Sequence, residues 1–311
     1  MRPFASFWRQ AFALEGSATP LVMPHVVAFG AVAAVVSAAA WAVERVFQQS
    51  LALAVAPYEV AGAVLGLLLV LRTNAGYDRW WEARKLWGGI VNQSRNLAAH
   101  GLAYGPADTD WRRRFVAWTA AFGHAARASL RGERDCPEVA ALVGPDDGRR
   151  VAAADHAPSY VALRLAGLLR EACAAHDMDR FAFAEADRQR AALIDHVGAC
   201  ERILKTPLPT AYSIIIRRFL VVFLVTLPFG LLDEVPSHWL IPFITVLVAY
   251  PVVALDQIGI ELQNPFSKAK LNSLPLDDIT ATIERNLTGL LADAGRDSRG
   301  DFPAPAAGTV S

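Results

Sequence analysis

The sequence predicts an all-α membrane protein in which four transmembrane helices are joined to a large helical cytoplasmic portion. Hydrophobic residues make up 54% of the 311 residues and the mean hydropathy is positive, at +0.28, which is typical of membrane proteins. The chain contains four apolar runs that approach the length of a membrane span. Between the second and third runs, apolar residues recur at three- and four-residue spacing, the period of an amphipathic helix.

The four apolar runs are the candidate spans. A hydrocarbon core of about 30 Å requires roughly 20 helical residues. The runs are Leu21–Val43, Leu51–Leu71, Phe219–Leu232 and Trp239–Leu255. The third run is short but extends back to Ile214. Because Arg217 and Arg218 stand near its beginning, we expect this end of the helix to lie at the membrane–water interface.

The distribution of cations predicts the orientation of these helices. The linker Asp233–His238 contains no Lys or Arg. The long stretch Arg72–Arg218 is rich in arginine, and Lys268 and Lys270 follow the fourth run. By the positive-inside rule, both termini and the long middle region are expected in the cytoplasm.

The middle region is predicted to be helical with one interruption. Its helical segments are Trp111–Leu130, Pro158–Ala175 and Met178–Lys205. Cys136–Ala157 contains Pro137, Gly144-Pro145 and Gly148, so we expect a loop or a broken helix there.

The expected organisation has six parts. They are a cytoplasmic N-terminal segment (1–20), transmembrane helices 1 and 2 (21–72, the second at 51–72), a helical cytoplasmic domain (73–212), transmembrane helices 3 and 4 (213–256), cytoplasmic C-terminal helices (257–294) and a tail (295–311). The tail is rich in Gly, Pro and Ala, so we expect it to be disordered.

Composition and motifs exclude several functions. Lys+Arg and Asp+Glu balance at 30 each, so no basic excess indicates nucleic acid as a partner. The three cysteines, Cys136, Cys173 and Cys200, are widely spaced, which fits a reducing compartment better than a disulfide frame or a zinc site. Nucleophile-elbow, zinc-protease, Walker and dinucleotide motifs do not occur in the sequence. We therefore expect no enzyme, no catalytic residue, no metal site and no cofactor.

The stretch Arg72–Gly89 combines three tryptophans and a tyrosine with four cations and two acids. Such residues are stable at a membrane–water boundary, so one interpretation is an aromatic belt with no further role. The alternative is a set of ion pairs, because a belt does not need so many charges. In that case Glu82 can reach Lys85 on the next turn. Trp80 and Trp81 are adjacent and are expected to face different surroundings.

The order of these residues resembles the bacterial branch of the bestrophin family. The matching blocks are Leu65-Gly66-Leu67, Arg72-Thr73-Asn74, Tyr77, Arg79-Trp80-Trp81-Glu82-Ala83-Arg84, Leu86-Trp87-Gly88, Asn92-Gln-Ser-Arg95, Gly198-Ala-Cys-Glu-Arg202, Thr206-Pro-Leu-Pro209, Ala211-Tyr212, Leu227-Pro228-Phe229, Asn264-Pro-Phe266 and Leu274-Pro-Leu-Asp277. They span most of residues 55 to 290 in one order. The structural signature comprises Arg72, Asn74, Arg79, Trp80, Trp81, Glu82, Arg84 and Trp87. The resemblance implies a homopentameric ion channel in the bacterial inner membrane, with membrane lipid and monovalent ions as partners.

One stripe of the second apolar run is a candidate pore wall. Glu59, Ala63, Leu67 and Leu71 recur every four residues, so they follow one helix face over roughly 18 Å. The residues alone favour a stripe that faces lipid or the bundle, with Glu59 solvated near the outer surface. The resemblance implies that 51–72 lines the pore, that residues 63, 67 and 71 form its apolar neck, and that Glu59 lies at the outer mouth. Rings of branched apolar side chains resist wetting and so can gate conduction.

The resemblance also implies a cytoplasmic aperture, and this chain departs from animal members of the family at their calcium site. Counting back from Pro209 assigns the aperture to Phe181, whose alternative role is that of a core residue at a helix start. Animal members bind calcium after Asn-Pro-Phe, where Lys268 and Lys270 stand in this chain. Calcium needs 6–8 oxygen ligands, so we expect no calcium site and no activation by calcium.

The sequence supports two alternatives for the permeant ion. The family as a whole is described as chloride channels, which implies an anion. Five copies of Glu59 would attract cations, and the neck lacks the aromatic rings of animal members, so a sodium-selective channel is the alternative. Competing classes are a secondary transporter, which usually shows inverted repeats, and a non-conducting membrane scaffold.

Overall fold

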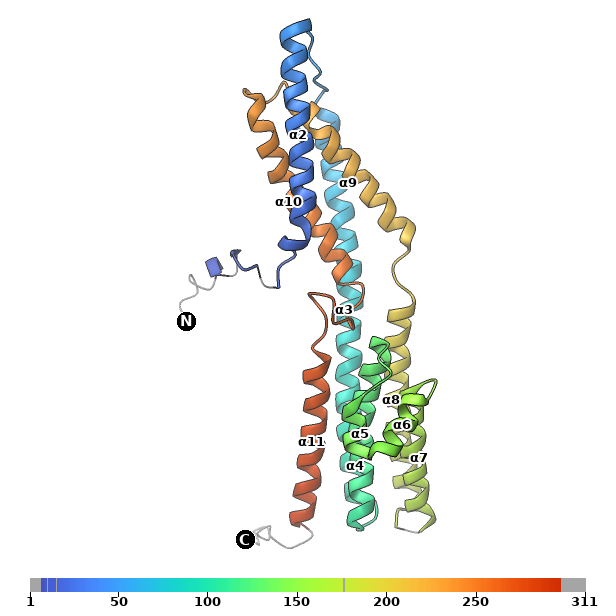
Figure 1. Cartoon of the computed structure of the whole chain (residues 1–311). Coiled ribbons are helices and arrows are strands. Elements are labelled where there is room, and N and C mark those ends of the chain that lie inside the picture. Colours follow the sequence, from blue (N-terminus) through green and yellow to red (C-terminus); the bar gives the residue numbers. More distant parts are fainter. Residues whose placement is uncertain (1–6, 10, 15, 176, 298–311) are drawn as a thin grey trace, which may run out of the picture. The chain divides into compact units, whose positions relative to one another are not determined.

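The computed structural model describes residues 7–9, 11–14, 16–175 and 177–297. Every regular element in these residues is a helix (Figure 1). The chain divides into two compact units. The first unit is Met1–Trp81 with Thr206–Ser273, and the second unit is Glu82–Lys205 with Leu274–Ser311. The long helix α3 (Ala56–Tyr104) contributes residues to both units.

The first unit contains the membrane helices. They are α2 (Thr19–Phe47), the first part of α3, α9 (Thr210–Leu231) and α10 (Ile241–Glu261), which follows the 3₁₀ helix η1 (His238–Leu240). Among the described residues, four helical stretches are long and apolar enough to cross a membrane, so the predicted number of spans is confirmed. Helix α3 continues without interruption from the second span through the Arg72–Gly89 stretch to Tyr104.

Apolar residues at four-residue spacing build the core of the first unit. Val22 and Val26 of α2 pack with Leu65 and Leu69 of α3, and Leu224 of α9 belongs to the same cluster. Spacing of four places successive side chains on one helix face. The approach of α2 to α10 is close at Gly30, where an added Cβ would lie 2.7 Å from Cγ2 of Val246. A larger residue there would push the two helices apart.

The second unit is a helical bundle around α4. It contains the rest of α3, α4 (Thr109–Arg131), α5 (Pro137–Val143), α6 (Pro145–Ala153), α7 (Ala157–Ala174), α8 (Arg180–Lys205) and α11 (Leu276–Asp297). The Asp108 side chain caps α4 by accepting from the Trp111 N–H at 3.0 Å, and Gly132 ends the helix with φ of 71°. Most of α4 is buried against α5, α7 and α11.

The structure refines two expectations for the second unit. The segment Cys136–Ala157 is largely two short helices, α5 and α6, separated by Gly144 with φ of 93°. Such a positive φ favours glycine. Helix α11 continues to Asp297, three residues into the segment for which we predicted disorder. Residues 298–311 and 1–6, which belong to the predicted tail and N-terminal segment, lie outside the described residues.

A charged cluster ties α4, α5 and α11 together. The Arg127 guanidinium pairs with Glu138 at 2.9 Å and with Asp277 at 3.0 Å, and Arg131 pairs with Asp277 at 2.7 Å. Partial burial acts to raise the pKa of Glu138, but hydrogen bonds from the backbone and from Arg127 outweigh it and lower the pKa to about 2. Glu138 therefore stabilises the folded unit in its ionised form.

The contribution of Glu138 to stability is expected to disappear in acid. Because its pKa falls from an ordinary 4.5 to about 2 on folding, the contribution is fully present above pH 4.5 and is lost as the pH falls toward 2. We expect Glu138→Gln to lower the unfolding free energy of the second unit by about 1 kcal/mol at pH 7, since water screens a side chain that is 39% exposed. The difference from the wild type should vanish near pH 2 in thermal unfolding. The matched control is Glu171→Gln, which removes the exposed pair with Arg114; an equal loss there would contradict a special role for Glu138.

Candidate functional site

The predicted pore stripe lies on an uncovered face of α3. Leu67 is 60% exposed and Leu71 is 50% exposed, whereas Leu65 and Leu69 on the opposite face are each 1% exposed. Ala63 and Glu59 are also exposed. One side of α3 therefore packs into the first unit, while the side that carries all four predicted residues is largely exposed among the described residues.

The signature residue Arg72 is the centre of a buried ion network. Its Nη1 donates to Oδ1 of Asp256, and its Nη2 donates to Oγ of Ser213 at 3.3 Å. The Nε of Arg217 donates to Oδ2 of the same carboxylate at 3.2 Å. Arg72 is 1% exposed and Asp256 is 7% exposed. One carboxylate thus joins α10 to α3 and α9 through two guanidinium groups.

Asp256 and Arg217 were not among our predicted site residues. Asp256 stands one position beyond the fourth apolar run and is the last residue of the predicted transmembrane region 213–256. A usable signal was present: an acid adjoining an apolar run is costly unless it pairs with a cation. The sequence could not indicate which arginine would be its partner.

Aromatic residues of the signature form a stack in the first unit. The ring centroid of Tyr77 lies 6.3 Å from Trp80 and 6.4 Å from Trp81. The Trp80 indole donates to the Asn272 carbonyl at 2.8 Å, whereas Trp81 is exposed. The two tryptophans therefore have different surroundings. Asn74, one turn before this stack, is exposed.

Arg79 anchors two loop carbonyls of the same unit. Its Nη1 donates to the Thr206 carbonyl at 2.7 Å, and its Nε contacts the Gln263 carbonyl at 3.4 Å. This cation holds the backbone that precedes α9 and the backbone that follows α10. The belt interpretation does not account for such a role, because a belt residue would face lipid and headgroups.

The remaining signature residues lie in the second unit. Glu82 accepts from Nη2 of Arg202 at 2.9 Å, so the expected pairing with Lys85 was wrong. The partner comes from α8 and not from the next turn of α3. Trp87 is fully buried and Arg84 is exposed. Close packing of α3 and α8 depends on Gly89, where an added Cβ would lie 2.5 Å from the His196 ring.

Phe181 lies at the start of α8, and its side chain is exposed in the protomer. The Asp179 carboxylate accepts from the backbone N–H of Phe181 at 2.7 Å and of Ala182 at 3.1 Å. This cap fixes the first turn of the helix. Phe181 is 90% exposed in the protomer, so its alternative role as a core residue at a helix start is wrong for the protomer.

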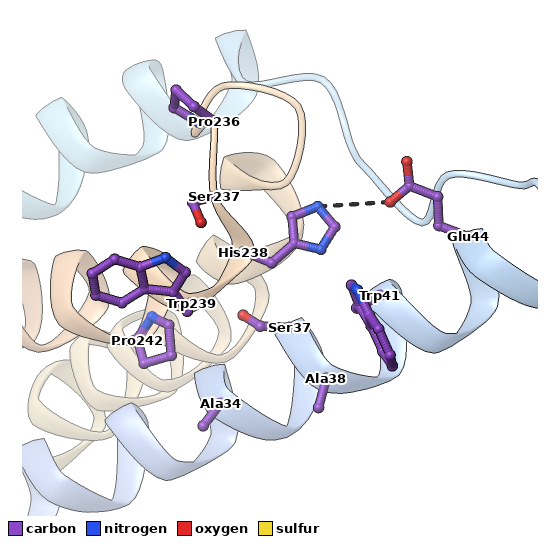
Figure 2. Close-up of a pocket in the computed structure, with 10 residues that line it drawn as sticks. All are labelled: Ala34, Ser37, Ala38, Trp41, Glu44, Pro236, Ser237, His238, Trp239 and Pro242. Atoms are coloured by element: carbon purple, nitrogen blue, oxygen red, sulfur yellow. Dashed lines mark ion pairs between the residues drawn. The ribbon is translucent and has the colours of Figure 1, made fainter.

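One pocket of the first unit lies at the end of α2 that is remote from Thr19. It measures about 810 Å³ and is lined by α2 and by the segment that begins α10. Figure 2 shows the His238 imidazole facing Glu44, and Nε2 of His238 lies 3.8 Å from the carboxylate. Trp41 and Trp239 also line this pocket. It contains none of the predicted site residues.

The described side chains include no cluster that could hold a metal ion. In residues 7–9, 11–14, 16–175 and 177–297, no three His, Cys, Asp or Glu side chains are grouped to hold a metal ion. Burial raises the pKa of Cys200 to about 12, so this thiol is not a nucleophile at neutral pH. Near the expected position of a calcium loop, Glu261 pairs with Lys270 at 3.3 Å and accepts from the Leu271 N–H at 3.0 Å. The absence of activation by calcium stays a prediction.

These features define a helical integral membrane protein with a structural ion network and an uncovered apolar helix face. The sequence pattern described as Bacterial/Fungal Bestrophin protein matches residues 1–289. The chain therefore belongs to this family, as its resemblance implied. The all-α fold with four spans is confirmed with it, and membership places the protein among channels rather than enzymes.

Similar proteins cover nearly the whole chain. A voltage-dependent anion channel-forming protein of Mesorhizobium japonicum is 32% identical over 295 residues, which is 94% of this chain and 93% of that protein. A protein of the same description from Ralstonia nicotianae is 31% identical, over 98% of this chain and 97% of its own. The crystal structure of a bacterial bestrophin homologue from Klebsiella pneumoniae has a TM-score of 0.80 at 26% identity, and covers 87% of this chain and 98% of that chain.

Proposed function

We propose that the protein is a homopentameric channel of the bacterial inner membrane that conducts monovalent ions passively. In this assembly α3 lines the pore, with Ala63, Leu67 and Leu71 as the neck and Glu59 at the outer mouth. Phe181 forms the cytoplasmic aperture. Both termini lie in the cytoplasm. The number of subunits follows from the resemblance.

The observation that carries this proposal is the uncovered stripe of α3. An apolar helix face that is largely exposed in its own protomer must meet lipid, another subunit or a pore. Leu67 and Leu71 are half or more exposed, and Glu59 follows the same stripe. A carboxylate facing hydrocarbon is costly, so a stripe that includes one is better accommodated along a water-filled path.

Anions are the first candidate for the permeant ion. The relatives described as voltage-dependent anion channel-forming proteins support this choice. A cation-selective channel is the second candidate, and Glu59 is the specific observation that favours it. Aliphatic neck residues provide no edge of an aromatic ring to attract anions.

A salt gradient distinguishes the two ions. In a tenfold KCl gradient, we expect purified protein in planar bilayers to give a reversal potential close to the equilibrium potential of chloride. Glu59→Gln should shift the reversal potential further toward the chloride value by roughly 10–20 mV, because five carboxylates no longer repel anions at the mouth. Glu44→Gln is the matched control, since Glu44 is an exposed acid of another membrane helix. A reversal potential close to the equilibrium potential of potassium would indicate a cation channel. Equal shifts in Glu59→Gln and Glu44→Gln would contradict the placement of Glu59 at the outer mouth.

The same recordings test the competing classes. A secondary transporter gives saturable flux in liposomes without unitary currents, and a scaffold gives neither. Unitary currents from purified oligomers are the result that the proposal requires.

A further inference from the structure

A second pocket of the first unit lies where α2 begins and α10 ends. It measures about 380 Å³ and is lined by residues of α2, α9 and α10. Its apolar wall is formed by Ala28, Phe29, Leu220, Val221 and Val253. Its polar lining comprises His25, Arg217, Asp256 and Gln257. The pocket thus has an apolar side and a charged end.

The charged end carries an uncompensated cation. Asp256 is the acid that faces both Arg72 and Arg217, and each of its two oxygens already accepts from one of them. The nearest further acid of α10, Glu261, pairs with Lys270 instead. Two guanidinium groups therefore share one carboxylate, which leaves a net charge of about +1 beside the pocket.

Arg217 is the group that can bind a ligand. Its Nε is engaged by Asp256, but neither terminal nitrogen donates to a group in the described part of the chain. Its side chain is 56% exposed, while Arg72 is fully buried. The terminal N–H groups of a guanidinium match the paired oxygens of a phosphate.

The pocket lies at the end of α9 that carries Arg217 and Arg218, the end that we expect at the membrane–water interface. Arg217 is in the second turn of α9, His25 in the second turn of α2, and Asp256 in the last two turns of α10. Lys268 and Lys270 follow α10. Basic pockets between membrane helices on the cytoplasmic side bind anionic lipid headgroups.

We propose that this pocket binds the phosphate of an anionic phospholipid. Arg217 holds the phosphate through its two terminal nitrogens, and the start of an acyl chain lies against Phe29 and Val221. The bound phosphate supplies the negative charge that Asp256 alone cannot provide for two arginines. This inference does not depend on conduction.

Titration of the purified full-length protein with lipid tests the proposal. Detergent-solubilised oligomers are titrated with phosphatidylglycerol or phosphatidylcholine, and bound lipid is measured by native mass spectrometry. We expect the wild type to bind phosphatidylglycerol roughly tenfold more tightly, which is the effect of one good charge-assisted contact. Arg217→Gln should abolish this preference.

The neighbouring arginine provides a matched control. Arg218 is exposed on the same helix and does not line the pocket, so Arg218→Gln should change the affinity less than about twofold. Ala28→Trp fills the pocket without changing charge and should weaken phosphatidylglycerol roughly as much as Arg217→Gln does. If Arg217→Gln fails to fold, Arg217→Lys retains the charge but loses the planar fork, and should weaken binding several-fold.

Three results would overturn the proposal. Equal losses for Arg217→Gln and Arg218→Gln would indicate general surface attraction. Unchanged binding in Ala28→Trp would show that lipid does not enter the pocket. Displacement of the lipid by inorganic phosphate at comparable concentration would assign the site to a free anion.

Discussion

Replacing Asp256 with alanine is expected to lower the free energy of unfolding of the first unit by about 3–5 kcal/mol. The substitution leaves Arg72 buried at 1% exposure with no carboxylate in contact, and it removes the link from α10 to α3 and α9. Removing one partner of a buried ion pair is costly because the remaining charge is desolvated without compensation. Thermal unfolding of the purified protein, followed by helical circular dichroism, measures the loss.

Two variants make the Asp256 result specific. Asp78→Ala removes an exposed acid of the same unit that has no ion pair in the described residues, and it should change stability by less than about 0.5 kcal/mol. Arg72→Met combined with Asp256→Ala should recover part of the loss, because both charges are then absent. A loss below about 1 kcal/mol in Asp256→Ala alone would mean that the Arg72 charge is compensated elsewhere.

Leu67→Ala is expected to raise the basal current through the channel by roughly tenfold. If Leu67 forms a ring in the neck, five shortened side chains widen it and allow water to remain in a constriction that otherwise dewets. The open-state conductance should increase together with the open probability. Single-channel recording in planar bilayers measures both quantities.

The control for Leu67 is the same substitution on another membrane helix. Leu247 of α10 is 75% exposed, so Leu247→Ala removes the same atoms from an exposed surface of the first unit. It should leave conductance unchanged. If Leu67→Ala and Leu247→Ala behave alike, the neck is not at Leu67, and the uncovered face of α3 contacts lipid or a neighbouring subunit.

Much of the fold follows from local pattern. Apolar runs of sufficient length predicted the spans, and three- and four-residue periodicity predicted α4, α7 and α8, because each is decided by neighbouring residues along one helix. The second span was predicted to end at residue 72, and the continuation of α3 to Tyr104 was not predicted. In the structure Gly89 permits close packing within a continuous helix.

The candidate site, too, was predictable from the sequence only in part. The stripe of Glu59, Ala63, Leu67 and Leu71 was visible in the sequence because a spacing of four fixes a shared helix face. Its assignment to a pore came from the resemblance, and it stays a prediction. The partners of the charged signature residues were beyond the sequence, as the change from Lys85 to Arg202 for Glu82 illustrates.

The sequence by itself therefore determined the number of spans, the helical class and the family, all of which depend on composition, periodicity and residue order. Only the tertiary structure decided that Asp256 serves both Arg72 and Arg217, and that Arg217 retains free donors beside an apolar pocket. The physical reason is that these contacts join residues separated by as many as 184 positions. Which charges meet across such a separation depends on how three helices pack, and no local pattern encodes that packing.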